Sequence, residues 1–426
     1  MITSIIKQQR EERDFLLRQG YIERIDRSAK ESLLGSDLIK LISGPRRAGK
    51  SVLALQILKD QDFAYLNFDD DQLLAAFNQD EVVRALKEVY GNYRYLLLDE
   101  IQNLDGWELW VNKLARRGTN LVITGSNARL LSRELATTLT GRFTEIRVWP
   151  FSFSEMLAHN SMKSDLSKDI TPSDQGTIMH ALDHYLIHGG FPEVVRNPGM
   201  GNSYLSTLFD SLILKDILNR FKVRQNKQLY DLASWMVTNY TNPYTYNQLK
   251  NDLRFNSVAT VQKFCGYLSE AFLLISLPIY ATKQKLHQRS PQKVYMVDNG
   301  FVQARSFEQS PNSGGLLENL IMVELLRRGY QPGLELFYYR TRNNKEIDFV
   351  VRKGHSVEQL IQVCFDLSST KTRKRELAAL IEASGELRCT KHLLITWNHE
   401  ECIEFPESSV QIIPAWKWLL EMRNEE

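Results

Sequence analysis

The sequence has 426 residues, 43% of them hydrophobic, and its 53 Lys and Arg residues nearly balance its 51 Asp and Glu residues for a net charge of +2. This length exceeds what one core usually spans, so about two to three domains are expected. The near-neutral charge excludes a nucleic-acid-binding field over the whole molecule, so any DNA contact must come from local patches. Without an apolar run of roughly 18 residues or a signal-like apolar start, a cytoplasmic protein without membrane contact is expected. The four cysteines lack C-x-x-C spacing, which argues against structural zinc or a disulfide framework.

A glycine-rich segment lies early in the chain, between an apolar segment typical of a strand and one typical of a helix. It fits the phosphate-binding loop pattern G-x-x-x-x-G-K-[ST] at every constrained position. In such a loop, backbone N–H groups and the lysine bind phosphates, and the final hydroxyl binds Mg²⁺. The sequence therefore predicts a nucleoside triphosphate with Mg²⁺, held by Gly44, Pro45, Arg46, Arg47, Ala48, Gly49, Lys50, Ser51 and the following Val52.

Two carboxylates, Asp99 and Glu100, follow the apolar segment at residues 95–98. At the end of a parallel strand, Asp99 is expected to hold Mg²⁺ together with Ser51, and Glu100 to orient or deprotonate the attacking water. Adjacent acids alone would fit a solvated loop equally well. Because the two acids follow a phosphate-binding loop in the sequence, they favour a catalytic site that also uses Lys50.

Two further segments contain candidate nucleotide-site residues, each of which fits two different roles. Ser126 and Asn127 end the apolar run at residues 119–125, where they fit either a γ-phosphate sensor or an ordinary helix cap. Arg142 precedes another predicted strand. It fits an arginine finger, acting in cis or from a neighbouring subunit, and it fits a surface salt bridge.

The loop and the L-D-E-I-Q segment at residues 98–102 resemble a group of AAA+-like ATPases of archaea and bacteria whose phosphate loop reads G-P-R-R-x-G-K-[ST]. The likeness continues through residues 124–126, 139–142 and 149–155 and into the C-terminal region. It implies ATP as the nucleotide and ATP hydrolysis as the reaction. It also implies a sheet in which one inserted strand separates the phosphate-loop strand from the strand that ends in Asp99. Because AAA+ relatives often form rings, a homo-oligomer is one expectation.

The middle of the chain changes to helical periodicity after Pro150, which predicts a helical lid with a turn at residues 189–193 (G-G-F-P-E). Residues 246–253 and 257–270 have helix-turn-helix form, with Ser257 as the cap and Val261, Phe264 and Leu268 as the buried stripe. Two strands around a basic loop follow, as in a winged helix. DNA phosphates are expected to meet Lys263, Lys283, Lys285, Arg289 and Lys293. A protein partner or a packing interface is the alternative.

The C-terminal region resembles the PD-(D/E)XK nuclease core, as does that of the ATPase family. The resemblance assigns a metal site to Glu318, Asp348 and an acid-x-lysine pair, here at positions 362 and 364. Strand alternation places Glu346 on the same face as Asp348, which adds it to the predicted site. Gln362 stands where an acid is usual and Cys364 where a lysine is usual, so cleavage is not expected. A lysine displaced onto the next helix, Lys371 or Lys374, is the alternative source of that charge.

The expected fold is α/β, with a P-loop NTPase core, a helical lid, a winged helix and a restriction-endonuclease-like domain. The predicted boundaries are 1–30 for an N-terminal helical arm, 31–155 for the core, 156–235 for the lid, 236–298 for the winged helix and 299–426 for the nuclease-like domain. The expected function is Mg²⁺-dependent ATP binding and hydrolysis, with ATP and ADP controlling a DNA-binding module. The alternatives are a nucleotide-controlled switch for protein partners and an ATP-regulated DNA nuclease in defence or mobile-element biology.

Overall fold

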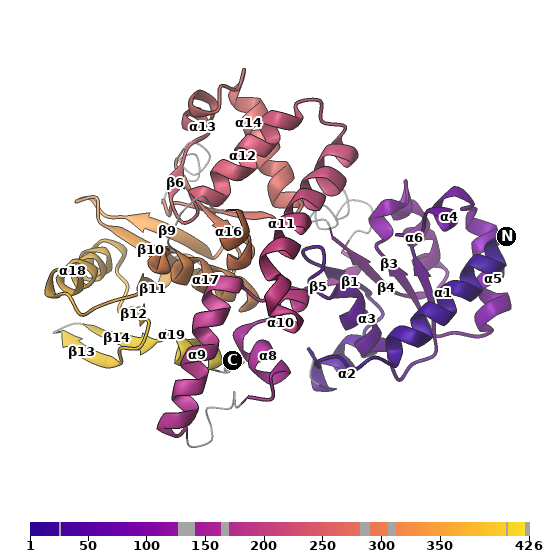
Figure 1. Ribbon diagram of the computed structural model, residues 1–426, viewed down its shortest axis with the longest axis horizontal. Coiled ribbons are helices and arrows are strands. Elements are labelled where there is room, and N and C mark those ends of the chain that lie inside the picture. Colours follow the sequence, from indigo (N-terminus) through magenta and orange to yellow (C-terminus); the bar gives the residue numbers. More distant parts are fainter. Residues whose placement is uncertain are drawn as a thin grey trace. The chain divides into compact units, whose positions relative to one another are not determined.

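The computed structural model describes residues 1–24, 27–126, 141–162, 170–281, 290–305, 312–405 and 408–421. They form two compact units, one of Met1–Pro150 with Glu270–Phe272 and one of Phe151–Ser269 with Leu273–Glu426 (Figure 1). Asn127, Lys283, Lys285 and Arg289, all predicted site residues, lie outside the described residues. In the part of the chain described, no helix is both long and apolar enough to span a membrane.

The first unit is built on a five-stranded sheet with the order β2-β3-β4-β1-β5, in which all neighbours are parallel. Strand β4 lies between β3, which ends in Asp99, and β1, which leads into the phosphate loop. The predicted inserted strand is therefore confirmed. The strands are β1 (Ile39–Ser43), β2 (Phe63–Asn67), β3 (Tyr95–Asp99), β4 (Asn120–Gly125) and β5 (Phe143–Arg147). The helices are α1 (Ile2–Leu17), α2 (Arg27–Gly35), α3 (Lys50–Leu58), α4 (Asp71–Ala75), α5 (Gln79–Tyr90) and α6 (Trp107–Arg116), with a 3₁₀ turn at Ile101–Asn103.

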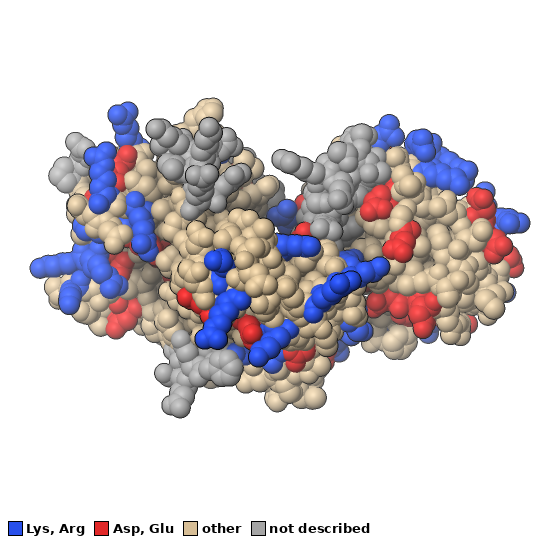
Figure 2. Space-filling view, turned by 90° about the horizontal axis from the view of Figure 1, so that it is seen from above, with Lys and Arg blue, Asp and Glu red and all other residues tan. Residues whose placement is uncertain are grey.

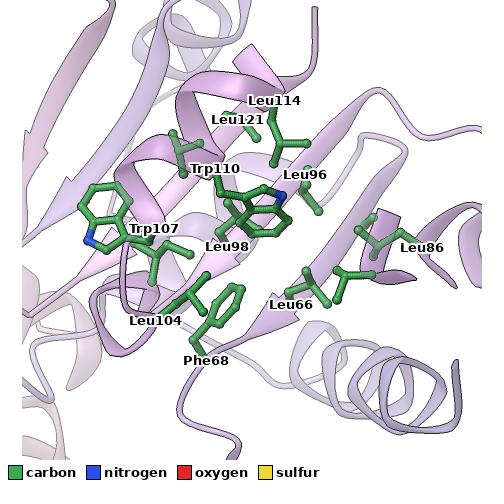
Figure 3. Close-up of a cluster of buried hydrophobic side chains, with 14 of the residues drawn as sticks. Leu66, Phe68, Leu86, Leu96, Leu98, Leu104, Trp107, Trp110, Leu114 and Leu121 are labelled. Carbon is green, nitrogen blue, oxygen red and sulfur yellow. The ribbon is translucent and has the colours of Figure 1, made fainter. Parts of the chain in front are cut away.

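Hydrophobic clusters cover both faces of this sheet. Along β3, Leu96 and Leu98 belong to one cluster and Leu97 to the other, because successive side chains of a strand point to opposite faces. Figure 3 shows the first cluster, in which Phe68 meets Trp110 edge-on at 6.1 Å between ring centroids. Three isoleucines of α1, in the predicted N-terminal arm, are buried in this cluster, so that helix is part of the core packing: Ile2, Ile5 and Ile6.

The second unit begins with helices, as the periodicity after Pro150 predicted. They are α8 (Phe153–His159), α9 (Pro172–His188), α10 (Pro192–Arg196), α11 (Gly201–Ser211) and α12 (Asn226–Thr238), with a 3₁₀ turn at Pro198–Met200 and a π-helix at Leu212–Asn219. The turn between α9 and α10 is bound by the side chain of Asp298. The Asp298 carboxylate accepts hydrogen bonds from Gly190 N at 2.8 Å and Gly300 N at 2.9 Å. A Cβ on Gly189, whose φ is +74°, would lie 1.7 Å from Asp298 Oδ1, so this turn requires glycine.

A small sheet with the order β6-β8-β7 follows, and two helices lie between β6 and β7 in the chain. The helix start at Ser257 is confirmed, because its hydroxyl accepts from Thr260 N at 3.1 Å, and so is the buried stripe Val261, Phe264 and Leu268. The predicted hairpin is present as antiparallel β7 and β8. The elements are β6 (Pro243–Tyr244), α13 (Tyr246–Asp252), α14 (Val258–Glu270), β7 (Leu274–Pro278) and β8 (Gln292–Met296).

The C-terminal part is a six-stranded sheet with the order β13-β14-β12-β11-β10-β9. Strands β9, β10 and β11 are antiparallel, whereas β12 pairs with β11 in parallel after the crossover helix α18. The elements are α16 (Asn299–Arg305), α17 (Ser313–Arg327), β9 (Leu336–Arg340), β10 (Glu346–Lys353), β11 (Ser356–Cys364), α18 (Thr370–Leu387), β12 (Lys391–Thr396), β13 (Glu401–Phe405), β14 (Ser408–Pro414) and α19 (Ala415–Leu420).

Candidate nucleotide-binding site

The phosphate loop follows the buried strand β1 and ends where α3 begins at Lys50. Gly44 has φ +150°, and a Cβ there would lie 2.0 Å from Val148 O; Gly49 has φ +95°. Neither position accommodates a side chain without strain. The backbone thus reaches the amino end of α3, where free N–H groups and the helix dipole favour an anion.

Lys50 is the buried cation of this loop. It is 3% exposed, its Nζ donates to Pro45 O at 3.0 Å, and Glu100 Oε1 lies 3.5 Å away. A phosphate oxygen would give the ammonium a stronger, charge-assisted partner than the carbonyl does. Lys50 therefore stands where it can move between the Glu100 carboxylate and a bound phosphate.

The Asp99 carboxylate is held by hydroxyl groups from three strands or helices. Ser51 Oγ donates to Asp99 Oδ1 at 2.8 Å, Thr124 Oγ1 donates to the same oxygen, and Tyr65 Oη lies 3.3 Å from Oδ2. Burial and the charge of Glu100 raise the pKa of Asp99 to about 6, against the hydrogen bonds from Thr124 and Ser51. A cation bound here would favour the ionised carboxylate. The hydroxyl and carboxylate oxygens of Ser51 and Asp99 are hard ligands, so this pair fits Mg²⁺.

Glu100 occupies a strained position. Its φ is +51°, which is uncommon for a residue other than glycine and is typical of functional sites. Gln102 Nε2 donates to Glu100 Oε2 at 2.5 Å, and Ser126 Oγ donates to the same oxygen at 3.1 Å. Burial opposes its ionisation, but Lys50 and these hydrogen bonds hold the pKa of Glu100 below its usual range. The carboxylate is therefore ionised at neutral pH, as a base must be.

Four residues at this site had no role in the sequence interpretation. Thr124 joins both acids, because its hydroxyl also accepts from Glu100 N at 2.9 Å. Gln102 belongs to the L-D-E-I-Q segment, so its position was visible although its contact was not. Tyr65 lies in an ordinary apolar strand. Arg24 donates to Ala48 O in the loop at 2.7 Å and to Trp149 O at 2.8 Å, and nothing in the local sequence indicated this.

Arg142 lies at the amino ends of β1 and β5, whereas the phosphate loop follows the carboxyl end of β1. The Arg142 carbonyl accepts from Ile39 N at the start of β1, and β5 then runs parallel to β1. Five strand residues, or roughly 16 Å at about 3.3 Å each, separate this level from Gly44. The predicted action of Arg142 in cis is therefore wrong, because its side chain is too short. Action from a neighbouring subunit stays a prediction.

Lys293 is not a surface residue. It is 1% exposed and ion-paired with Glu318, Glu346 and Asp348, so the prediction that it contacts DNA phosphates is wrong. Lys263 is exposed on α14, as expected. Figure 2 shows basic and acidic side chains together on the face it presents, in keeping with the small net charge.

The three acids predicted for the degenerate nuclease site do come together around Lys293. Gln362 is adjacent, since its Oε1 accepts from Asp348 N at 3.2 Å and its Nε2 donates to Glu376 Oε2 at 2.8 Å. Lys371 and Lys374 are exposed on α18, whereas Glu376 is the buried charged residue of that helix. The relocation of the missing lysine to α18 stays a prediction.

Comparisons with known proteins cover most of the chain. The AAA domain model matches residues 36–157, and two domains of unknown function, DUF8612 and DUF4143, match residues 179–311 and 313–418. An uncharacterized protein of Methanocaldococcus jannaschii is 30% identical over 434 residues, which is 96% of each chain. The chain belongs to the same family as this protein. A second relative, an uncharacterized protein of Haemophilus influenzae, is 31% identical, and the match covers 91% of this chain and 95% of that protein.

Solved structures were matched as well. A Walker-type ATPase of Pyrococcus abyssi matches with a TM-score of 0.43 at 16% identity, and the match covers 68% of this chain and 99% of the ATPase chain. The Aeropyrum pernix ORC1 protein in complex with DNA has a TM-score of 0.33 at 12% identity, covering 74% and 98%. The AAA domain match spans the phosphate loop, Asp99 and Glu100. Residues 36–157, which lie mostly in the first unit, are thus similar to AAA domains, and the all-parallel sheet of this unit resembles a P-loop NTPase core.

Proposed function

We propose that this family member is a Mg²⁺-dependent ATPase that uses its nucleotide state to control a DNA-binding second unit. The observation that carries the proposal is the coupling of Glu100 to Lys50 on one side and to Gln102 and Ser126 on the other. A catalytic base, the phosphate-binding cation and a polar strand end are thereby linked in one buried network. This arrangement is suited to ATP hydrolysis rather than to ATP binding alone.

Each residue of the network has a distinct task in this proposal. Lys50 and the loop N–H groups bind the β- and γ-phosphates, while Ser51 and Asp99 hold Mg²⁺, whose charge offsets that of the phosphates. Glu100 orients the attacking water and accepts its proton. Ser126 and Gln102 position the Glu100 carboxylate for this step through their hydrogen bonds to Oε2.

The proposed DNA-binding module is a winged helix formed by α13, α14 and the β7–β8 hairpin. Supporting it are the Ser257 cap, the buried stripe of α14 and the exposed Lys263 on the opposite face. Lys283, Lys285 and Arg289 belong to the same basic segment of the sequence. Each phosphate that a lysine or arginine neutralises steepens the salt dependence of binding.

The C-terminal domain is proposed to be nuclease-like in fold but inactive in cleavage. Its order of α17, three antiparallel strands, α18 and a parallel β12 supports that fold assignment. Gln362 replaces an acid and Cys364 replaces a lysine at the positions that would support hydrolysis.

A second candidate function is a nucleotide-controlled switch for a protein partner. It is favoured by the burial of Lys293, which removes one of the predicted phosphate contacts.

The test is ATP hydrolysis by the full chain with and without duplex DNA, together with DNA binding over a range of salt concentrations. A chain with Lys263, Lys283, Lys285 and Arg289 changed to alanine should bind DNA more weakly and with a flatter salt slope. A matched chain with Lys371 and Lys374, exposed on α18, changed to alanine should keep the slope. Equal slopes for all chains, or no DNA binding, would favour the protein-partner switch.

A further inference from the structure

Lys293 stands in the middle of an acidic cluster in the second unit. Its Nζ lies 2.7 Å from Glu346 Oε1, 2.8 Å from Glu318 Oε1 and 3.2 Å from Asp348 Oδ1. The three acids come from two elements, Glu318 from α17 and the other two from β10, and Lys293 comes from β8. All four side chains are therefore brought together by tertiary structure and not by local sequence.

Each acid is held by a second donor. Tyr295 Oη donates to Glu318 Oε1 at 2.7 Å, Arg340 Nη2 donates to Glu346 Oε2 at 3.0 Å, and Val363 N donates to Asp348 Oδ2 at 3.0 Å. These contacts orient one oxygen of each acid toward a shared point. The ammonium of Lys293 occupies that point, with one of its three hydrogens available for each carboxylate.

Three carboxylate oxygens around one point are also the ligand set of a hard divalent cation. An ammonium and a divalent cation cannot share this position, because two positive charges would lie within a few ångströms of one another in a buried site. As the cluster stands, with Lys293 against all three acids, it is not arranged to hold a metal ion, and no other group of three or more His, Cys, Asp or Glu side chains among the described residues is. The lysine therefore satisfies the acids in place of a metal.

The strand that carries Lys293 is the central one of the β6-β8-β7 sheet, where Lys293 is paired with Pro243 and Leu277. Any displacement of β8 along or away from its neighbours would move the ammonium with it. The position of this cation therefore depends on the hairpin that contains it.

We propose that Lys293 is the resident cation of the Glu318, Glu346 and Asp348 cluster: it excludes divalent metal from the position between the three acids and ties the β6-β8-β7 sheet to α17 and β10. This inference is independent of the proposed ATPase activity. It accounts for a nuclease-like domain without metal-dependent cleavage by a feature other than Gln362 and Cys364. It also distinguishes Lys293 from a displaced catalytic lysine, which would act beside a bound metal rather than instead of one.

The test is Mn²⁺ binding to the full chain without nucleotide, measured by electron paramagnetic resonance. All variants carry Ser51→Ala, which removes a ligand of the nucleotide site. With Lys293 present, no Mn²⁺ binding that depends on Asp348 is expected. Lys293→Met should add one Mn²⁺ per chain, and a further Asp348→Asn should abolish it. Asp348-dependent binding with Lys293 in place would overturn the proposal, as would no gain in a Lys293→Met chain whose circular dichroism matches that of its parent.

Lys293→Met leaves three acids without their cation, so a second measurement uses the unaltered chain. Under reductive methylation, Lys293 should stay unmodified, with or without millimolar Mn²⁺, while the exposed Lys263 reacts. This result would support the proposal even if Lys293→Met does not fold. Methylation of Lys293 as fast as Lys263, or methylation that begins when Mn²⁺ is added, would overturn it.

Discussion

Replacing Glu100 by glutamine removes the proposed base with little change in shape. In the structure, Glu100 Oε2 accepts from Gln102 at 2.5 Å and from Ser126 at 3.1 Å, and Oε1 lies 3.5 Å from Lys50 Nζ. An amide oxygen can still accept from Gln102 and Ser126, so the local fold should survive. The amide cannot accept the proton of the attacking water. Lys50 loses its carboxylate partner, which leaves the ammonium more available to phosphate.

The expected loss of turnover follows from the usual contribution of a general base, roughly 10² to 10⁴-fold, or about 3 to 5 kcal/mol in activation free energy. ATP affinity should stay the same or increase. Phosphate release and binding of a fluorescent ATP analogue would measure the two quantities separately. Glu11→Gln, an exposed acid on α1, is the matched control and should change neither. Turnover by Glu100→Gln within about threefold of the parent would refute the assignment of Glu100.

Three further predictions concern residues in both units. Gln102→Ala should lower turnover by about 3- to 10-fold with unchanged ATP affinity, because one hydrogen bond that positions Glu100 is lost at about 1 kcal/mol; unchanged turnover would remove Gln102 from the network. Gly189→Ala should lower the free energy of unfolding, measured in urea, by about 2 to 4 kcal/mol, because a Cβ is unfavourable at this positive φ and would also clash with Asp298. The control, Gly176→Ala on α9, has nothing within 4 Å of the added Cβ and should be neutral or stabilising. Equal effects of the two substitutions would contradict this role of Gly189. Burial raises the pKa of Asp298 to about 6, against hydrogen bonds from two backbone N–H groups, so its ionisation destabilises the fold. Stability relative to Asp298→Asn should therefore be highest near pH 4 and fall by on the order of 2 to 3 kcal/mol as pH rises through 6, and a rise over this window would contradict that sign.

The nucleotide site could be predicted from sequence because its chemistry stands in contiguous motifs. Ser51 and Asp99 meet as expected, since both follow strands whose carboxyl ends share one sheet edge. Thr124 and Gln102 lie within the segments that carry the family resemblance, yet their contacts depend on side-chain geometry that residue spacing does not specify. Arg142 was placed before a strand correctly, but the sequence did not reveal that this strand, β5, pairs in parallel with β1 and so puts Arg142 far from the loop.

The second unit was harder to predict because its interactions are long-range. Lys293 stands at the end of a basic run, and its partner Asp348 is 55 residues away, so local composition indicated a surface cation. The G-G-F-P-E turn was expected only to separate helices. Its second glycine binds Asp298, 108 residues further along the chain, and no local pattern carries that information.

We propose above that the loop from Gly44 to Ser51 binds ATP and that Glu100 acts in its hydrolysis. The most direct test is phosphate release from ATP by the purified full chain, with Mg²⁺ and with EDTA, beside Lys50→Ala. Turnover should require Mg²⁺ and should be lost in Lys50→Ala, because the alanine has no charge to offer the phosphates. Turnover that persists in Lys50→Ala or in EDTA, or its absence from a folded, unaltered chain that binds ATP, would contradict the proposed role of this loop.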